Sequence, residues 1–237
     1  MQKQKTPIFQ KVNFPNQGNN LLHCAVDYFN LPFHFHPEIE INLVVRGKGT
    51  RYVGYQKENF GAGDLVILGA NLPHSWEVDP ATNIERSESK HLYINPAIDF
   101  FNIPELAEVE QFLKLAQKGI VLKGKTKSKV SKLLVGMDYS SEIDKVETTI
   151  RIFNLLLESK EWETINNEAY QHDINLPVSE KLANVMGYVY THINDREKLR
   201  LEVIAEQIDM NPTSFSRLFS QKMGMSMRDY ISGLRGR

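Results

Sequence analysis

The sequence predicts an α+β protein with a β-rich N-terminal part, a helical middle and an all-helical C-terminal part. Short apolar runs bounded by Gly, Asn or Pro, such as Leu65-Val66-Ile67-Leu68, recur over residues 1–95 and indicate many short strands. From Pro104 onward, apolar residues recur at helical spacing instead. We expect the three parts at residues 1–98, 99–177 and 178–237.

Composition excludes several classes of protein. Of the 237 residues, 41% are hydrophobic, so the chain can bury a core and is not wholly disordered. No apolar run is long enough to span a membrane, and residues 1–17 lack the apolar stretch of a secretory signal. The single cysteine, Cys24, cannot form an internal disulfide, which fits a reducing compartment. We therefore expect a cytoplasmic protein with no membrane partner.

Three helices are expected in the middle part. The first begins near Pro104, which suits a first helical turn, and ends at Gly119. The second covers about 125–137, and the third covers 142–158 behind Ser141 as its N-cap. The third helix is expected to turn inward Ile143, Val146, Ile150, Phe153 and Leu157.

The C-terminal part follows a polar stretch, 159–178, that we interpret as a linker. A helix over 179–193 carries one apolar stripe at helical spacing. Two short helices follow at about 201–208 and 212–222, and a further helix begins at Ser226. The three residues between the two short helices match the turn of a helix-turn-helix.

The residues at this turn all suit a tight corner. Ala205 is small where the second helix must cross the first closely, and Met210 fills the corner. Asp209 lies where the turn needs a left-handed backbone, which Asp tolerates. Asn211 is a good N-cap, and Pro212 suits a first helical position. The alternative interpretation is a plain helical bundle with a solvated polar face.

The second short helix leaves one face polar, with Thr213, Ser216, Arg217 and Ser220. A recognition helix enters the major groove of DNA with its N-terminal half, where Arg pairs with guanine and hydroxyl groups meet bases or phosphates. Residues 178–237 contain nine basic and seven acidic residues, a net charge of +2, whereas the whole chain has −1. This excess is a weak indication of phosphate contact.

A larger set of residues includes this turn: Ile204-Ala205 to Asn211, Phe215-Ser216-Arg217-Leu218-Phe219, Gly224-Met225-Ser226 and Tyr230-Ile231 to Arg235. The set resembles the first helix-turn-helix of the AraC/XylS family of bacterial transcription regulators. The resemblance implies binding to DNA, with Thr213, Ser216 and Arg217 facing the bases. Family members continue into a second such unit, whereas this sequence stops at Arg237. We therefore expect weak DNA binding. The end at Arg237 is consistent with a natural truncation and with a cloned fragment.

Another set of residues lies in the β-rich part: His34, His36, Glu40 and Gly47, followed by Gly63-Asp64 and Pro73-His74. The two groups resemble the first and second motifs of the cupin fold, over about residues 20–95. The resemblance implies a double-sheet β-barrel, which agrees with the many short strands.

His34, His36, Glu40 and His74 form a candidate ligand set. His34 and His36 share one face of a strand because side chains alternate, and His74 comes from a distant strand. Three imidazoles and a carboxylate suit a divalent metal such as Zn, Fe, Mn or Ni. The alternatives are a metal-free pocket that hydrogen-bonds an organic effector through the same residues, and a structural role. Five aromatic residues are expected at the barrel mouth or in ordinary packing: Phe33, Phe35, Tyr52, Tyr55 and Trp76. No role is assigned to His23, His91, His172 or His192.

The alternation of polar and apolar residues in the strand over 39–46 predicts how this strand packs. If Glu40 points into the pocket, the apolar residues that alternate with it lie outside the barrel and need a cover. The helices of 104–158 are the expected cover, within the chain or at a dimer interface. These outward residues are Ile39, Ile41, Leu43 and Val45.

Three functions fit the sequence. The first is an AraC-family regulator that senses a small molecule, such as a sugar, in its cupin-like domain and controls promoters through the helix-turn-helix. In this hypothesis 99–177 dimerises, and an N-terminal arm over about 1–20 folds over the pocket. The second is a cupin-type metalloenzyme, a dioxygenase or isomerase. The third is a truncated competitor that acts by dimerisation alone. Because only the first needs an exposed recognition helix, we expect a homodimeric regulator without enzymatic activity.

Overall fold

The structure, a computed structural model, describes residues 7–10, 12, 21–27, 33–81, 87–96, 103–170, 182, 185, 188–189, 192, 195–223 and 226–234. The chain forms two compact units. The first consists of Met1–Pro7 and Phe14–Tyr170, and the second of Ile8–Asn13 and Gln171–Arg237. Most of the expected N-terminal arm, and His172, lie outside the described residues.

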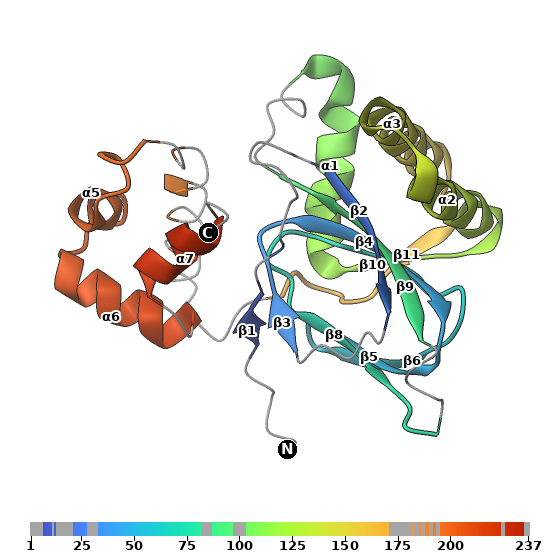
Figure 1. Cartoon of the computed structure of the whole chain (residues 1–237), viewed down its shortest axis with the longest axis horizontal. Coiled ribbons are helices and arrows are strands. Elements are labelled where there is room, and N and C mark those ends of the chain that lie inside the picture. Colours follow the sequence, from blue (N-terminus) through green and yellow to red (C-terminus); the bar gives the residue numbers. More distant parts are fainter. Residues whose placement is uncertain are drawn as a thin grey trace. The chain divides into compact units, whose positions relative to one another are not determined.

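The strands of the first unit form two sheets that face each other (Figure 1). One sheet contains, in order, β3 (His34–Phe35), β8 (His74–Val78), β5 (Gly49–Val53) and β6 (Gln56–Phe60). The other contains, in order, β11 (Trp162–Thr164), β10 (Ile120–Leu122), β7 (Leu65–Leu68), β4 (Ile39–Arg46), β9 (Glu88–Ile94) and β2 (Leu21–Asp27). The described strands thus confirm the cupin-like double-sheet fold, but they form a two-sheet sandwich rather than a closed barrel.

Helices cover the outer face of the six-stranded sheet, as expected (Figure 1). Ile39, Ile41 and Leu43 of β4 belong to one buried cluster with Val109 and Phe112. The cover comes from the same chain. Its elements are η3 (Pro104–Leu106), α1 (Ala107–Leu115), η4 (Ala116–Lys118), α2 (Gly124–Gly136), η5 (Met137–Tyr139) and α3 (Glu142–Glu158). The first helical segment ends where expected, at Gly119, which has a φ of 67°.

The opposite face of the same sheet encloses a second apolar cluster. Val44 of β4 and Leu68 of β7 pack there with Val53 and Trp76 from the other sheet. The alternation along β4 therefore sends Glu40 and Val44 toward the space between the sheets, while the odd-numbered apolar residues contact the helices.

Helix α3 begins where expected but turns a different face inward. Ser141 accepts a hydrogen bond from the Asp144 backbone and forms a capping box with it. Of the residues expected inward, Phe153 alone is buried. The helix carries two apolar stripes roughly a quarter turn apart, and spacing alone does not distinguish which one packs on the sheet. The buried residues are Thr149, Ile152, Phe153 and Leu156. The others have exposed fractions of 73% at Ile143, 37% at Val146, 41% at Ile150 and 37% at Leu157.

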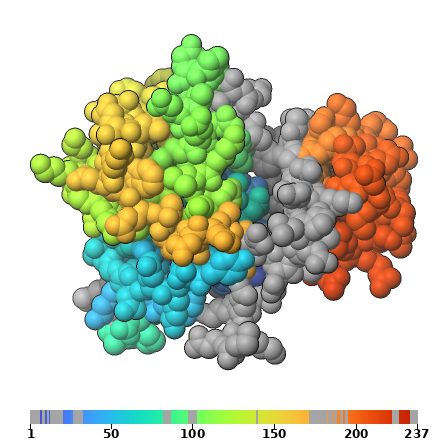
Figure 2. All heavy atoms as spheres, turned by 180° about the vertical axis from the view of Figure 1, so that it is seen from behind, coloured from blue at the N-terminus to red at the C-terminus, as the bar shows by residue number. Residues whose placement is uncertain are grey.

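The first part of the expected linker is instead a strand of the first unit. Residues Trp162–Thr164 form β11, which pairs antiparallel with β10. The Asn166 side chain is buried and donates hydrogen bonds to the carbonyls of Val53 and Lys118. The yellow-to-orange segment that follows α3 lies along the boundary between the helices and the cyan strands (Figure 2). Strand pairing thus continues past 159 although the sequence there is polar.

The second unit contains three described helices and the short strand β1 (Ile8–Phe9). The helices are α5 (Leu201–Glu206), α6 (Pro212–Met223) and α7 (Met227–Leu234). In the expected helix over 179–193, the described apolar residues Leu182, Val185 and Val189 are buried, and the rest of its stripe lies outside the described residues. None of the described helices combines the length and the apolar character needed to cross a membrane.

Candidate functional site

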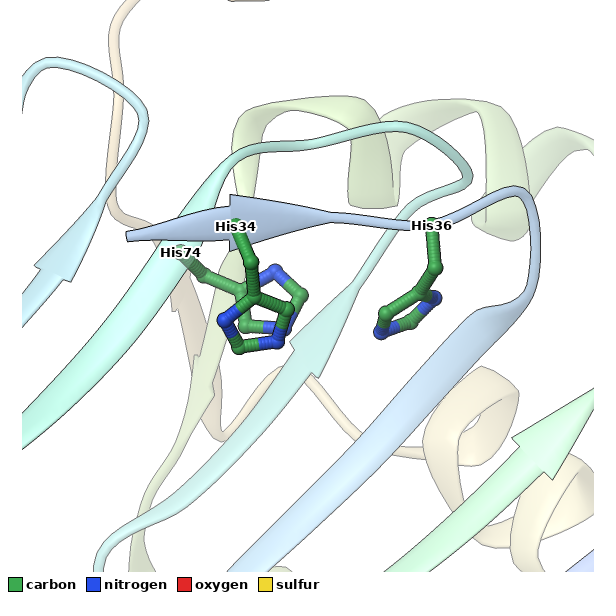
Figure 3. A group of neighbouring side chains, drawn as sticks. All are labelled: His34, His36 and His74. Carbon is green, nitrogen blue, oxygen red and sulfur yellow. The ribbon is translucent and has the colours of Figure 1, made fainter. Parts of the chain in front are cut away.

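The four residues of the candidate ligand set come together between the two sheets. His34 on β3 and His74 on β8 are directly opposite each other in an antiparallel pair. His36 follows β3, and its ring points to the same side as that of His34 (Figure 3). Glu40 on β4 comes from the other sheet. All four side chains are buried.

Short distances join these side chains. One ring nitrogen from each of His34, His36 and His74 lies within 4.8 Å of the other two, so these atoms could ligate one ion. Figure 3 shows the three side chains as neighbours. Glu40 Oε2 is 2.9 Å from His36 Nε2 and 3.2 Å from His74 Nε2. His74 Nδ1 lies 2.7 Å from the Leu72 carbonyl oxygen, so a proton on Nδ1 leaves Nε2 free to act as a ligand.

His91, for which the sequence predicts no role, belongs to the same cluster. Its Nδ1 lies 2.7 Å from Glu40 Oε1, and Asn42 donates to the same carboxylate oxygen over 3.1 Å. His91 Nε2 is 2.6 Å from the Ser89 hydroxyl, and the Tyr93 ring stacks on its imidazole. The signal for this group was alternation along 88–94, where Ser89, His91 and Tyr93 share one strand face.

Glu40 is the negative centre of the cluster. Burial by itself raises its pKa, but the charges of His91 and His74 and the hydrogen bond to His36 outweigh burial, so its pKa lies well below the usual range. Burial lowers the pKa of His36, but hydrogen bonds to Glu38 and Glu40 raise it to about 9. The structure therefore favours an ionised carboxylate at the centre of buried imidazoles.

A cavity of about 20 Å³ lies beside these residues, and its lining includes Trp76 and Tyr93. This volume holds about one water molecule. Of the five aromatic residues considered for the barrel mouth, Trp76 lines this cavity. Phe33 and Phe35 are buried, Tyr52 is half-buried, and Tyr55 is 50% exposed.

The donor set fits a divalent metal ion. Imidazole nitrogen and carboxylate oxygen are the ligands that Zn, Fe, Mn and Ni accept. His74 Nε2 is buried and lacks a hydrogen bond of good geometry, although it contacts Glu40 Oε2. A buried nitrogen without a good hydrogen bond lowers the stability of the fold unless a ligand or an ion binds to it.

The two other described histidines have other partners. His23 Nδ1 is 3.7 Å from Asp138 Oδ1, and burial lowers the pKa of His23. His192 Nδ1 is 2.9 Å from the Tyr188 carbonyl oxygen.

The second unit contains the expected sharp turn between α5 and α6. Asp209 has a φ of 54°, which is the left-handed conformation expected at this position. The Met210 amide donates to the Ala205 carbonyl, and Asn211 Oδ1 accepts from the Ser214 amide as the N-cap of α6. Phe215 and Phe219 are fully buried. Residues 201–223 therefore form two separate helices joined by a tight turn, and not one continuous helix.

The three predicted DNA contacts lie on the outer part of α6. Thr213 and Arg217 are exposed, and Ser216 is half-buried. The side chains of Thr213 and Arg217, four residues apart, share one face of the helix. The Arg217 guanidinium is thus available to a ligand outside the unit.

Solved structures show distant similarity to this chain. The AraC-like transcriptional activator CuxR is 13% identical over 91% of this chain and 72% of its own, with a TM-score of 0.41. ToxT from Vibrio cholerae O395, bound to (E)-4-(8-methylnaphthalen-1-yl)but-3-enoic acid, is 9% identical over 91% of this chain and 100% of its own, with a TM-score of 0.43. An oxalate decarboxylase of B. subtilis is 18% identical over 40% of this chain and 29% of its own, with a TM-score of 0.28. The comparison with curated proteins found no match.

Family models match both units. Residues 25–119 match the AraC-like ligand binding domain, and residues 196–232 match the bacterial regulatory helix-turn-helix proteins of the AraC family. Together the two matches cover more than half of the chain, in the order ligand-binding domain and then helix-turn-helix. These domains imply a small-molecule ligand and DNA as partners. The chain belongs to the AraC family of transcription regulators.

Proposed function

We propose that this regulator binds duplex DNA through α6 and responds to an ion bound at the histidine cluster. The observation that supports the DNA-binding role is the bend at Asp209. After this bend, α6 buries Phe215 and leaves Thr213 and Arg217 exposed. Because the DNA of a bacterial cell is in its cytoplasm, we also propose that compartment.

The DNA-binding role has a direct test. Selection of bound sequences from a random duplex library identifies the preferred site, and the Arg217→Ala variant is then compared with the wild type. Because arginine commonly pairs with guanine, the variant is expected to lose discrimination at one base pair, with a cost of about 1–3 kcal/mol for the preferred base. An unchanged preference at every position would contradict the role of Arg217.

For the ligand-binding domain, we propose a divalent metal ion held by His34, His36, Glu40 and His74. The close approach of the three imidazoles and the ionised carboxylate supports an ion. The cavity that the described residues form, of about 20 Å³, has room for a water-sized ligand but not for a sugar. The ion would add positive charge beside Glu40, and its occupancy would favour one conformation of the regulator over another.

Metal analysis of the purified chain after dialysis against Zn, Ni, Mn or Fe tests this proposal. One equivalent of metal is expected in the wild type and far less in His74→Ala. His192→Ala is the matched control because His192 lies outside the cluster. Absence of stoichiometric metal, or equal metal in His74→Ala, would exclude the ion and favour an organic effector that hydrogen-bonds the same residues.

We further propose that the metal serves sensing rather than turnover. A cupin dioxygenase or isomerase needs space for an organic substrate beside its ligands, and the cavity formed by the described residues holds about one water molecule. The metal-loaded protein is therefore expected to be inactive toward small carbonyl compounds and aromatic acids. Turnover that disappears in His74→Ala would support the enzyme instead.

The exposed stripe on α3 leads us to propose a homodimer. Its members are Ile143, Val146, Ile150 and Leu157, and their successive spacings of three, four and seven residues match the a and d positions of a heptad. Because a stripe of this kind pairs with another helix of the same pattern, a second copy of α3 is the proposed occupant. In sedimentation equilibrium the wild type should be dimeric and the Ile150→Lys variant monomeric.

The matched control for this test is Arg151→Glu, an exposed change on the neighbouring face of α3 that should leave the dimer intact. A monomeric wild type, or a dimeric Ile150→Lys variant, would rule out the proposed interface.

A further inference from the structure

A groove of about 540 Å³ lies in the second unit, and it is separate from the exposed Arg217 side chain. Its lining residues come from the segment before α5 and the start of α5, from the middle of α6, and from α7 with the residue before it. Buried Leu199 and Met227 contribute an apolar floor, and Arg196 and Arg228 contribute exposed cationic rims. A groove with charged, exposed rims suits a ligand that passes along the surface rather than one that is enclosed.

Among the described residues of the second unit, no carboxylate neutralises the charge of the groove. Neither Arg196 nor Arg228 has an ion pair with another described residue, and the groove has no acidic residue among its described lining. Arg200 differs, since its guanidinium lies 3.5 Å from Glu197 and 3.8 Å from Glu202. Two guanidiniums without carboxylate partners have the donors that phosphate oxygens accept.

Serine residues also line the groove, at Ser216, Ser226 and Ser232, and the hydroxyl groups of Ser216 and Ser232 add further donors. Ser226 also caps α7, because its hydroxyl accepts from the Asp229 amide and donates to the Asp229 carboxylate. Asp229, the acid nearest in sequence to Arg228, is therefore engaged in the cap.

Ser216 connects the groove to the recognition face. It is half-buried and lines the groove, whereas its neighbour Arg217 is exposed. When a helix lies in the major groove of DNA, a phosphate backbone runs along each side of it. A cationic groove that begins beside the middle of α6 is thus where that backbone would pass.

We propose that this groove binds the DNA phosphate backbone, with Arg196 and Arg228 as ionic contacts and Ser216 as a hydroxyl contact to phosphate instead of to a base. This inference rests on the proposed DNA-binding function and names its backbone site. It assigns different tasks to adjacent residues of α6: Ser216 positions the helix and Arg217 reads sequence.

The test measures binding to a fluorescent 30-base-pair duplex of mixed sequence by anisotropy, over a series of salt concentrations. The slope of log K against log salt reports the number of phosphate contacts. Arg196→Gln and Arg228→Gln are each expected to reduce this slope by about 0.9. Arg200→Gln, a matched surface change outside the groove, should leave it unchanged. Ser216→Ala should weaken binding by the same factor on preferred and scrambled duplexes.

Several outcomes would overturn the inference. Unchanged slopes for both Arg196→Gln and Arg228→Gln, with wild-type binding intact, would refute the groove but leave the DNA-binding function standing. Wild-type protein that binds no duplex at low salt would refute that function itself. A second arm replaces chloride with inorganic phosphate at matched ionic strength. Phosphate that displaces DNA more readily from the wild type than from Arg228→Gln competes for the groove and supports the backbone contact, whereas equal displacement from both proteins would show that the groove does not hold the DNA backbone.

Discussion

His91 Nδ1 lies 2.7 Å from Glu40 Oε1, although 51 positions separate the two residues in the chain. The β4–β9 pairing explains this approach, because Asn42 is opposite His91 and Tyr93 is opposite Glu40. The carboxylate thus bonds on one oxygen to His91 and Asn42, and on the other to His36. Glu40 is held from both sheets, which fixes its position before any ligand arrives.

His91→Ala should therefore destabilise the fold and couple energetically to Glu40. Removal of this partner leaves a buried carboxylate less satisfied, and we expect a loss of about 1–3 kcal/mol in the free energy of unfolding. A double-mutant cycle with Glu40→Gln, measured by urea unfolding, should give a coupling energy of about 0.5–3 kcal/mol. His192→Ala is the control. Strict additivity of the two changes would show that the contact contributes nothing.

The sequence predicts the candidate site better than it predicts the packing around it. Cupin motif spacing identifies His34, His36, Glu40 and His74, because a ligand set requires fixed residue types at fixed places. His91 has no motif of its own. Its role depends on the register between β4 and β9, and a shift of one residue would turn it to the helices.

The faces of α3 show the same limit. Helical spacing predicts that the helix is amphipathic, and the Ser141 cap predicts where it begins. Because the helix has two apolar stripes, the choice between Ile152 and Ile150 as the buried residue depends on the sheet that it covers. That information is in the tertiary contacts and not in the local sequence.

The pH dependence of Cys24 alkylation should show the effects of burial and of the Glu40 charge on the thiol. Burial, and secondarily the charge of Glu40, raises the pKa of this thiol from 9.0 to about 11. Since only the thiolate reacts, alkylation by iodoacetamide should rise about tenfold per pH unit toward pH 11, whereas the urea-unfolded chain should level off near pH 9.

The raised pKa of Cys24 also makes the free energy of unfolding depend on pH. The folded state favours the neutral thiol, so this contribution is fully present below pH 9 and is lost as the pH rises through 11. Glu40→Gln removes a negative charge and should lower the pKa of Cys24. A profile that coincides with that of the unfolded chain would contradict both expectations.

Asp64 should control the environment of Trp76. The Trp76 indole donates to Asp64 Oδ2 over 3.3 Å, and the buried Arg51 guanidinium donates to Asp64 Oδ1 and, over 2.6 Å, to Glu58. Asp64→Ala removes an acceptor from both donors, with an expected cost of about 1–3 kcal/mol. In a Trp162→Phe background, the emission of Trp76 should shift. Glu58→Gln, which leaves the indole bond intact, should preserve the emission.

The turn at Asp209 gives a test of the helix-turn-helix corner. A left-handed backbone costs a residue with a Cβ about 1–2 kcal/mol, and Asp tolerates it better than most residues. Asp209→Val should therefore lower the free energy of unfolding of the second unit by about 1–2 kcal/mol, and Asp209→Gly should not lower it. Chemical unfolding followed by circular dichroism measures both. Equal stability of the Val and Gly variants would mean that the backbone relaxes out of this conformation.

Asn166 should anchor the segment after α3 to the first unit. Its amide nitrogen donates to the carbonyls of Val53 and Lys118 over 3.1 and 2.9 Å, and its oxygen accepts from the Tyr55 amide over 3.0 Å. Asn166→Ala removes the side-chain bonds to the Val53 carbonyl and the Tyr55 amide, whereas the Lys118 carbonyl keeps its bond from the backbone amide of residue 166. We therefore expect a loss of about 2 kcal/mol in the free energy of unfolding.

Asn167→Ala is the matched control for this change. The Asn167 side chain is exposed and only its backbone carbonyl accepts a bond, from Lys118 Nζ, so truncation should change stability by less than about 0.5 kcal/mol. Limited proteolysis adds a local measurement, because loss of the anchor should expose the chain near 159–170 before the rest of the unit unfolds. Equal protection of this segment in both variants would show that β11 pairing alone holds it, and that the polar sequence there is dispensable for the fold.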